Sequence, residues 1–323
     1  MKKLVVAFVI SIGVINFSFA AKPEKVGVLI LAHGGKYQSW DETVKNATET
    51  LKQKYIVEIA FGMANPTAIQ AGIDKLENQG VKKIVVVQLF ISSYSPIIRQ
   101  NEYLLGLRDT LADPPMLMMH HGSGQNMLKK EQGHHTMHEE GKHTMPSMSE
   151  KKTALQPLHF KSEIILTPPL DAHPLVAKII FDHIAELSVH PQNETVLIVA
   201  HGPNDEQDNK NWVKTIDGLA DQVRLLQSEK GKKFKQIFGL TVRDDADPAI
   251  YEQARAQLRT LVSQAGKDGE VIVIPLLLSQ GGVEERYVKR LEGLNYRWSG
   301  KTLLPHPNIT KFIQASVENA LKE

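Results

Sequence analysis

"ILAHGG", residues Ile30 to Gly35, ends an apolar, strand-like run with a histidine and two glycines. "IVAHGP", residues Ile198 to Pro203, does nearly the same in the second half of the chain. Each histidine follows a continuously apolar stretch, which is typical of a parallel strand covered by helices on both faces. Open α/β sheets bind ligands at the carboxyl ends of their strands. The two stretches therefore predict a ligand site that both halves build in the same way.

Apolar runs alternate regularly with amphipathic stretches along the rest of the chain. One amphipathic stretch, "PTAIQAGIDKLENQ", places Ile69, Ile73 and Leu76 on one helical face, and further helices are predicted near Trp212, Tyr251 and Val288. Strands are predicted at "VGVLILA", "IVEIAF", "KIVVVQLFI" and "EIILT", then at "TVLIVA", "KQIFGLTV", "EVIVIPLLL" and "KTLLP". We expect an α/β fold of two similar doubly wound parallel-sheet lobes.

Matching landmarks indicate an internal duplication. The pairs are His33 with His201, Asn65-Pro66 with Asp247-Pro248, Ser92 with Ser279, and His173-Pro174 with His306-Pro307. The residue numbers within these pairs differ by 168, 182, 187 and 133. The drop in the last difference indicates a large insertion in the first half. The expected domains are a signal peptide at 1–20, a first lobe at 22–189 with the insertion at 116–148, and a second lobe at 190–323.

The N-terminus has the pattern of a secretory signal peptide. Lys2 and Lys3 precede the apolar stretch "LVVAFVISIGVINF", and cleavage is expected after Ala20. No other segment is long and apolar enough to span a bilayer, so the mature chain is predicted to be periplasmic. Without Lys2 and Lys3, 36 basic residues balance 36 acidic ones, which argues against nucleic acid as a partner. The absence of cysteine excludes disulfides and thiolate metal sites.

The insertion is rich in potential metal ligands. Residues 116–148 hold seven of the 9 methionines and six of the 13 histidines, which are His120, His121, His134, His135, His138 and His143. Imidazoles suit Ni, Co, Cu and Zn, whereas thioethers favour Cu(I), so the mixture predicts metal capture without naming one ion. The alternative is a low-complexity, solvated loop.

The order and spacing of these motifs resemble the class II chelatases, the family of sirohydrochlorin and anaerobic cobalt chelatases, with ferrochelatase as a more distant relative. The resemblance rests on "LILAHGG", "LIVAHGP", "VEIAFGMANPTAIQAGIDKLENQGVKKIVVVQLFI" and "ILTPPLDAHPLVAKII". It implies two α/β lobes facing each other across a cleft that takes a tetrapyrrole. It also implies insertion of Co²⁺, Fe²⁺ or Ni²⁺ as a substrate, with no organic cofactor.

His33 and His201 match the family's strand-end histidine, so the resemblance implies that they bind the metal and act as catalytic bases. Gly34 and Gly202 would let the backbone turn and leave room for a flat ligand. The second family histidine is missing, because Pro96 and Val283 occupy its position in the two halves. His33 could instead face His201 across the cleft, or an insertion histidine could complete the set.

Charged residues near this position are further candidates. A carboxylate here resembles the arrangement in ferrochelatase, so Glu284 is predicted to act with His201 and Glu285 to bind metal. The alternative is that both acids only favour the start of a helix. Arg99 and Arg286 correspond across the repeat and could bind tetrapyrrole carboxylates, or they could be ordinary surface arginines.

The predicted function is metal insertion into a sirohydrochlorin-type tetrapyrrole. The main alternative is a periplasmic metal or tetrapyrrole carrier that has lost turnover. A transport-type binding protein that closes on a small solute is a third interpretation, but it leaves the paired histidines unexplained.

Overall fold

The computed structural model describes residues 25–322, apart from 36, 112, 114–154, 230 and 232. The predicted signal peptide and all six histidines of the insertion lie outside the described residues. Within the part that is described, no helix combines the length and the apolar character needed to cross a membrane.

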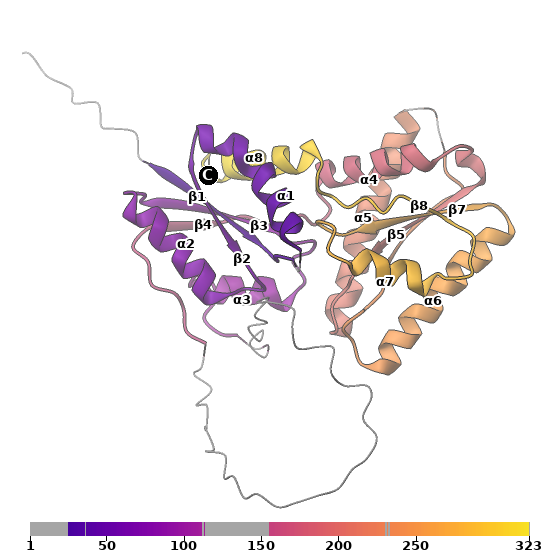
Figure 1. The fold of residues 1–323 in the computed structure, drawn as a ribbon, viewed down its shortest axis with the longest axis horizontal. Coiled ribbons are helices and arrows are strands. Elements are labelled where there is room, and N and C mark those ends of the chain that lie inside the picture. The colour runs from indigo at the N-terminus through magenta and orange to yellow at the C-terminus, as the bar shows by residue number, and fades with distance from the viewer. Residues whose placement is uncertain are drawn as a thin grey trace, which may run out of the picture.

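Two four-stranded parallel sheets form the centres of two lobes (Figure 1). In the first lobe the strand order is β2-β1-β3-β4, and in the second it is β6-β5-β7-β8. The first four strands are β1 (Val26–Ala32), β2 (Ile56–Phe61), β3 (Lys83–Leu89) and β4 (Glu163–Leu166). The second four are β5 (Glu194–Ala200), β6 (Gln236–Thr241), β7 (Glu270–Leu276) and β8 (Arg297–Trp298). The matching order confirms the predicted pair of similar lobes.

Helices cover both faces of each sheet. The first lobe contains α1 (Gln38–Thr48), the 3-10 helix η1 (Glu49–Gln53), α2 (Pro66–Asn78) and α3 (Pro96–Leu104). The second lobe contains the 3-10 helix η2 (Pro191–Asn193), α5 (Glu206–Glu229), α6 (Pro248–Lys267) and α7 (Val283–Arg290). Helix α2 begins as predicted, since the Asn65 side chain caps it by accepting from the N–H groups of Thr67 and Ala68.

The two lobes exchange one helix each. Helix α4 (Pro174–Leu187) follows β4 of the first lobe but packs against α5 and β7 of the second. Helix α8 (Pro307–Ala320) ends the chain and packs against α1 and β3 of the first lobe (Figure 1). Polar contacts agree, because Gln314 Nε2 donates to Thr50 Oγ1 at 3.1 Å. The sequence limits 22–189 and 190–323 therefore do not separate the two lobes in space.

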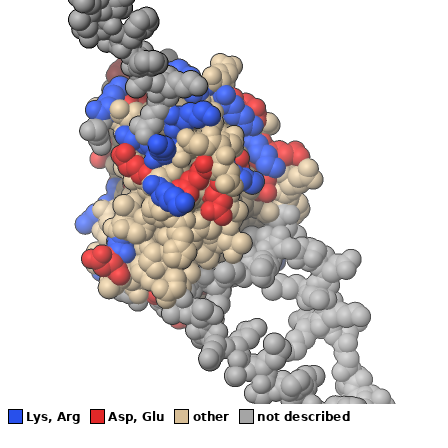
Figure 2. Space-filling view, turned by 90° about the vertical axis from the view of Figure 1, so that its left-hand side faces the viewer, with Lys and Arg blue, Asp and Glu red and all other residues tan. Residues whose placement is uncertain are grey.

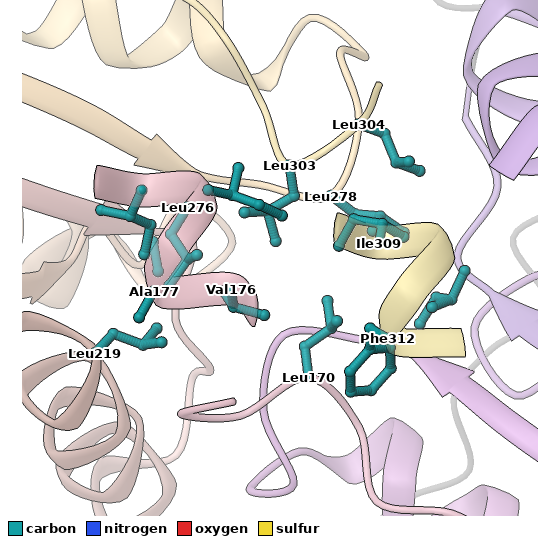
Figure 3. Packing of buried hydrophobic residues seen from close by; sticks show 14 of the residues in the cluster. Leu170, Val176, Ala177, Leu219, Leu276, Leu278, Leu303, Leu304, Ile309 and Phe312 are labelled. Carbon is teal, nitrogen blue, oxygen red and sulfur yellow. The ribbon is translucent and has the colours of Figure 1, made fainter. Parts of the chain in front are cut away.

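One buried hydrophobic cluster runs through both lobes. Leu170, Ile309 and Phe312 lie in it between the two sheets, together with residues of α4 (Figure 3). Phe312 is 2% exposed and Ile309 is fully buried. The lobes thus share a core, and burial of this apolar surface fixes their relative position.

The predicted position of the last strand is wrong. "KTLLP", residues 301–305, is not a strand, and β8 is the two-residue segment before it. Leu303 and Leu304 still donate their N–H groups to the carbonyls of Leu277 and Leu278, both at 2.8 Å. Their side chains are buried, whereas Pro305 has no N–H with which to continue a ladder. The apolar pattern therefore reflects core packing without a regular strand.

Charges of both signs are mixed on the face of the molecule shown in Figure 2. Basic and acidic side chains alternate over its upper part, and no extended patch of one sign appears on this face. The mixture agrees with the balanced composition of the chain.

Candidate functional site at the junction of the lobes

His33 and His201 come directly after β1 and β5, as predicted. The Nδ1 atom of His33 lies 2.7 Å from the carbonyl oxygen of Gly34, and that of His201 lies 2.8 Å from the carbonyl of Gly202. A carbonyl only accepts, so each Nδ1 carries a hydrogen and each Nε2 is the atom presented to a ligand. The two halves thus orient their histidines in the same way.

The glycines after the histidines are required by the backbone. Gly34 and Gly202 both have a φ of +76°, which is in the left-handed region. A Cβ on Gly202 would also lie 2.5 Å from the Cβ of Thr241 on the neighbouring strand. Gly202 can therefore pack this closely against Thr241 only because it has no side chain.

Asp245 is the partner of His201 in the second lobe. His201 Nε2 lies 3.1 Å from Asp245 Oδ2, and Asp245 follows β6, the neighbour of β5. Asp245 was not among the residues predicted from the sequence. The repeat gives no signal for it, because residues 62–64, between β2 and Asn65 in the first lobe, contain no carboxylate.

The environment favours the charged forms of both partners. Partial burial lowers the pKa of His201, but the hydrogen bond and charge of Asp245 outweigh it, so the net pKa is raised. The pKa of Asp245 is lowered, mainly by the hydrogen bond to His201, and the charges of Arg286 and His33 add to this effect. His33 belongs to the other lobe, so its charge reaches Asp245 across the junction.

The loop before α7 meets the first lobe near His33. The indole of Trp40 lies against Gly281, where an added Cβ would be 3.2 Å from its Cδ1 atom. The ring of Tyr37 lies against Gly282, with a corresponding distance of 3.7 Å. Together with the charge effect of His33 on Asp245, these contacts support the predicted alternative in which the two histidines face each other.

Glu284 does not pair with His201. Its carboxylate accepts from the N–H groups of Gly281 and Gly282, at 3.3 and 3.1 Å, at the beginning of α7. Glu285 is exposed on the same turn. Among the described residues, no group of three or more His, Cys, Asp or Glu side chains is arranged to hold a metal. The geometry thus favours the helix-start interpretation for both acids.

Residues 27–94, which include β1, β2 and β3 and His33, match the CbiX family model. This part of the first lobe is similar to the CbiX family. A sirohydrochlorin cobaltochelatase from Sulfolobus acidocaldarius is 36% identical over 69 residues, which make up 21% of this chain and 56% of that protein. The match therefore spans about half the length of this curated relative. The predicted class II chelatase relationship is confirmed.

Solved structures resemble both lobes together. SirB from Bacillus subtilis with Fe³⁺ gives a TM-score of 0.55 at 16% identity, covering 92% of this chain and 95% of that one. The sirohydrochlorin chelatase SirB from Bacillus subtilis subspecies spizizenii, in complex with cobalt, gives 0.56 at 14% identity, covering 92% and 96%. At this level of identity the similarity shows only the fold. It covers both lobes, whereas the CbiX match covers residues 27–94.

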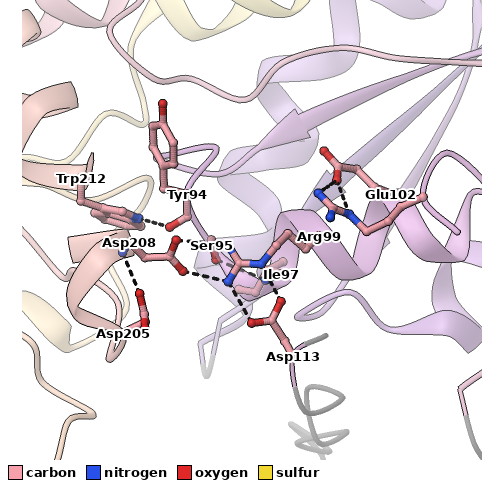
Figure 4. Close-up of polar contacts among 10 residues, drawn as sticks. Tyr94, Ser95, Ile97, Arg99, Glu102, Asp113, Asp205, Asp208 and Trp212 are labelled. Atoms are coloured by element: carbon pink, nitrogen blue, oxygen red, sulfur yellow. Dashed lines mark hydrogen bonds and ion pairs between the residues drawn. The ribbon is translucent and has the colours of Figure 1, made fainter. Parts of the chain in front are cut away.

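Arg99, on α3 of the first lobe, bridges two carboxylates (Figure 4). Its Nε and Nη2 atoms donate to Asp113 at 2.5 and 3.0 Å, and its Nη1 and Nη2 atoms donate to Asp208 on α5 at 3.2 and 2.8 Å. Arg99 holds the pKa of Asp113 below its usual range. The predicted contact with a tetrapyrrole carboxylate is not compatible with this use of the guanidinium.

Arg286 differs from Arg99, although the repeat relates them. Its side chain is 60% exposed, and its Nη1 atom lies 3.9 Å from Asp245 Oδ1. It is therefore the predicted arginine that remains accessible beside the His201–Asp245 pair. An open hollow of ≈ 540 Å³ also lies in the second lobe, but α7 and the turn after it line this hollow, away from the histidines.

His173 and His306 cap the two exchanged helices. The Nδ1 atom of His173 accepts from the N–H of Leu175, and that of His306 accepts from the N–H of Asn308, both at 3.1 Å. The ring of His306 also lies 6.1 Å from that of the buried His183. Protonation of either capping Nδ1 would remove its hydrogen bond. These hydrogen bonds favour the neutral forms of His173 and His306 where the two lobes join.

We expect the protein to lose stability as the pH falls from 7.5 to 5.5. Burial lowers the pKa values of His173, His183 and His306, and for His183 the charge of His306 lowers it further. As the pH falls through the ordinary histidine pKa of about 6.5, the unfolded chain therefore takes up protons before the folded protein does. This uptake favours the unfolded state. His201 has the opposite effect on the pH dependence of stability, since its raised pKa stabilises the folded protein at low pH.

Denaturant unfolding at the two pH values measures this loss. The control is the double variant His173→Asn/His306→Asn, because asparagine caps helices but does not titrate. Its stability should change less with pH than that of the wild type. An equal change in both proteins would contradict the assignment.

Proposed function

We propose that the protein inserts a divalent metal, Co²⁺, Fe²⁺ or Ni²⁺, into a sirohydrochlorin-type tetrapyrrole. The observation that carries the proposal is the His201–Asp245 pair, with a separation of 3.1 Å, which is within electrostatic reach of His33 from the other lobe. The printed names of the relatives support it, since they describe a sirohydrochlorin cobaltochelatase and SirB with iron or cobalt. The signal-like N-terminus supports a periplasmic location.

The pair has a suitable spacing for a metal ion. Imidazole nitrogen and carboxylate oxygen bind such ions at about 2.0–2.2 Å, so adjacent ligands on one ion lie about 3 Å apart. His201 Nε2 and Asp245 Oδ2 would supply two ligands and leave the remaining positions open. A substrate metal must leave the protein for the macrocycle, and a site with few protein ligands permits this exchange.

Proton transfer completes the proposed reaction. The tetrapyrrole must lose two pyrrole protons when the metal enters. His33 of the first lobe would accept one of them at Nε2 as a general base, and His201 would accept the other at Nε2 once the metal has left it for the macrocycle. Where His201 is protonated beside Asp245, metal binding would release that proton, because a histidine must lose it to bind the ion.

A carrier without turnover is the second candidate. One observation favours it, because the segment between β2 and Asn65 in the first lobe, residues 62–64, contains no carboxylate, so the first lobe has no counterpart of Asp245. In a carrier, the same residues would hold a metal or a tetrapyrrole without transferring the ion.

A visible absorption time course separates the two candidates. Purified protein would be mixed with sirohydrochlorin and with Co²⁺, Ni²⁺ or Fe²⁺ in turn, beside a protein-free control. Metallation faster than the control is the expected result, and the most effective ion identifies the preferred metal. Binding of metal or tetrapyrrole without faster metallation would contradict the enzyme and support the carrier.

A further inference from the structure

We propose that Arg243 is a positioning residue that holds the turn carrying Asp245 against the turn after His201. The inference rests on the proposed function in one respect, which is that these two residues together bind the metal. Arg243 is the second residue after β6, and its side chain is 7% exposed. Its side-chain hydrogen bonds reach from the turn after β6 to the turn after His201.

The guanidinium of Arg243 has three partners in the turn after His201. Its Nε atom donates to the carbonyl of Pro203 at 3.1 Å, and its Nη2 atom donates to the carbonyl of Asn204. Its Nη1 atom donates to Glu206 Oε2 at 2.6 Å. A planar guanidinium can hold three acceptors in fixed directions, which a flexible ammonium cannot do. Arg243 thus fixes the path of residues 203–206.

The backbone of Arg243 adds a direct connection. Its N–H donates to the carbonyl of His201 at 2.7 Å, and the side chain of Asn204 donates back to the carbonyl of Asp245 at 3.0 Å. The φ of Arg243 is +52°, a backbone conformation that is strained for a non-glycine residue. Such strain persists where surrounding contacts impose it, and here those contacts come from the histidine turn.

A second arginine, Arg290, also contacts the turn that carries Asp245. Arg290 is 2% exposed, pairs with the buried carboxylate of Asp244 and donates from Nη1 to the carbonyl of Val242 at 2.8 Å. Its guanidinium also lies 4.0 Å from the centre of the Tyr251 ring. Arg290 anchors the Asp245 turn to the core of the lobe, whereas Arg243 joins that turn to the histidine turn. The Arg243 connection is therefore the one that joins the two segments carrying His201 and Asp245.

The first lobe provides an internal comparison. The strand register places Met63 at the position of Arg243, because Phe61 pairs with Ala32 as Thr241 pairs with Ala200. A methionine side chain cannot donate hydrogen bonds, so the first lobe has no equivalent of the arginine connection. The arginine connection therefore occurs in the lobe that also has the carboxylate partner.

The test compares Arg243→Gly, Arg243→Lys and Arg224→Gln. Glycine adopts positive φ without strain, so Arg243→Gly removes the hydrogen bonds while relieving the backbone. Arg224 is a matched control on α5, because it also bridges a carboxylate, Asp221, and a carbonyl, that of Ile237, in the same lobe. Each protein is titrated with Co²⁺, and the signal that His201→Ala abolishes is taken as the signal of the pair.

Arg243→Gly should weaken this His201-dependent Co²⁺ binding by roughly 10–100-fold, the usual effect of losing a residue that orients metal ligands. The visible Co²⁺ spectrum should change, since it reports the ligands held. Arg243→Lys should recover part of the affinity, and Arg224→Gln should bind like the wild type. Unchanged affinity and spectrum in Arg243→Gly would overturn the proposal.

The outcomes also separate this inference from the proposed function. Wild-type Co²⁺ binding that depends on His201 and Arg243, without metallation of sirohydrochlorin, would overturn the enzyme and leave the positioning role in place. Metallation with unchanged Co²⁺ binding in Arg243→Gly would overturn the positioning role alone. Absence of any His201-dependent Co²⁺ signal in the wild type would overturn the positioning role, and the metallation assay would then judge the enzyme separately.

Discussion

Replacing His201 by alanine should lower the rate of metal insertion by about 100-fold or more. The variant removes both the Nε2 ligand and the proton acceptor of the pair, whose partner oxygen lies 3.1 Å away. His33→Ala should lower the rate as well, through loss of the base from the other lobe. The measurement is the initial rate of metallation, followed by visible absorption at saturating metal. Full rates in both variants would show that the two histidines are structural.

The carboxylate partner can be tested with a matched pair of variants. Asp245→Asn keeps the shape of the side chain but removes its charge, and it should lower the insertion rate by at least 10-fold. Glu284→Gln also neutralises a carboxylate near the junction, but this group accepts from N–H groups of its own loop, so its effect should be smaller. The reverse order of effects would restore Glu284 as the partner of His201.

Replacing Phe312 by alanine should lower the free energy of unfolding by about 3–5 kcal/mol. Phe312 lies on α8, is 2% exposed, and packs edge-on against His173 with ring centroids 5.0 Å apart. Its loss would leave a cavity where the two lobes share their core. Denaturant unfolding measures the change, and Phe238→Ala is the control, since Phe238 lies on β6 and is 36% exposed.

Hydrogen exchange locates the same effect within the molecule. Helix α8 packs against β3, so Phe312→Ala should speed amide exchange in β1 and β3 more than in β5. Faster exchange confined to the second lobe would contradict the exchanged position of α8. Equal destabilisation by Phe238→Ala would contradict the importance of this shared core.

The features predicted correctly depend on local patterns. Apolar runs identify seven of the eight strands, and the repeated Ala-His-Gly places both histidines at strand ends. The landmark Asn65-Pro66 marks the start of α2, because asparagine caps a helix and proline fits its first turn. Each of these signals lies within a few residues of the feature that it predicts.

The features that were missed depend on contacts between distant segments. Asp245 meets His201 only because β5 and β6 are neighbours in the sheet. Arg99 looks like an accessible arginine in the sequence, yet its carboxylate partner Asp208 comes from the other lobe. The apolar faces of α4 and α8 show that both helices are buried, but not which sheet each one covers.

The exchange of α4 and α8 also reverses the order in which the two lobes become complete during synthesis. Helix α4 leaves the ribosome before the second sheet exists, so it is already available when β5 to β8 follow. Helix α8, which packs against β3, is made about 220 residues after that strand. The lobe that is translated first therefore keeps the part of its sheet around β3 uncovered until α8 has been made.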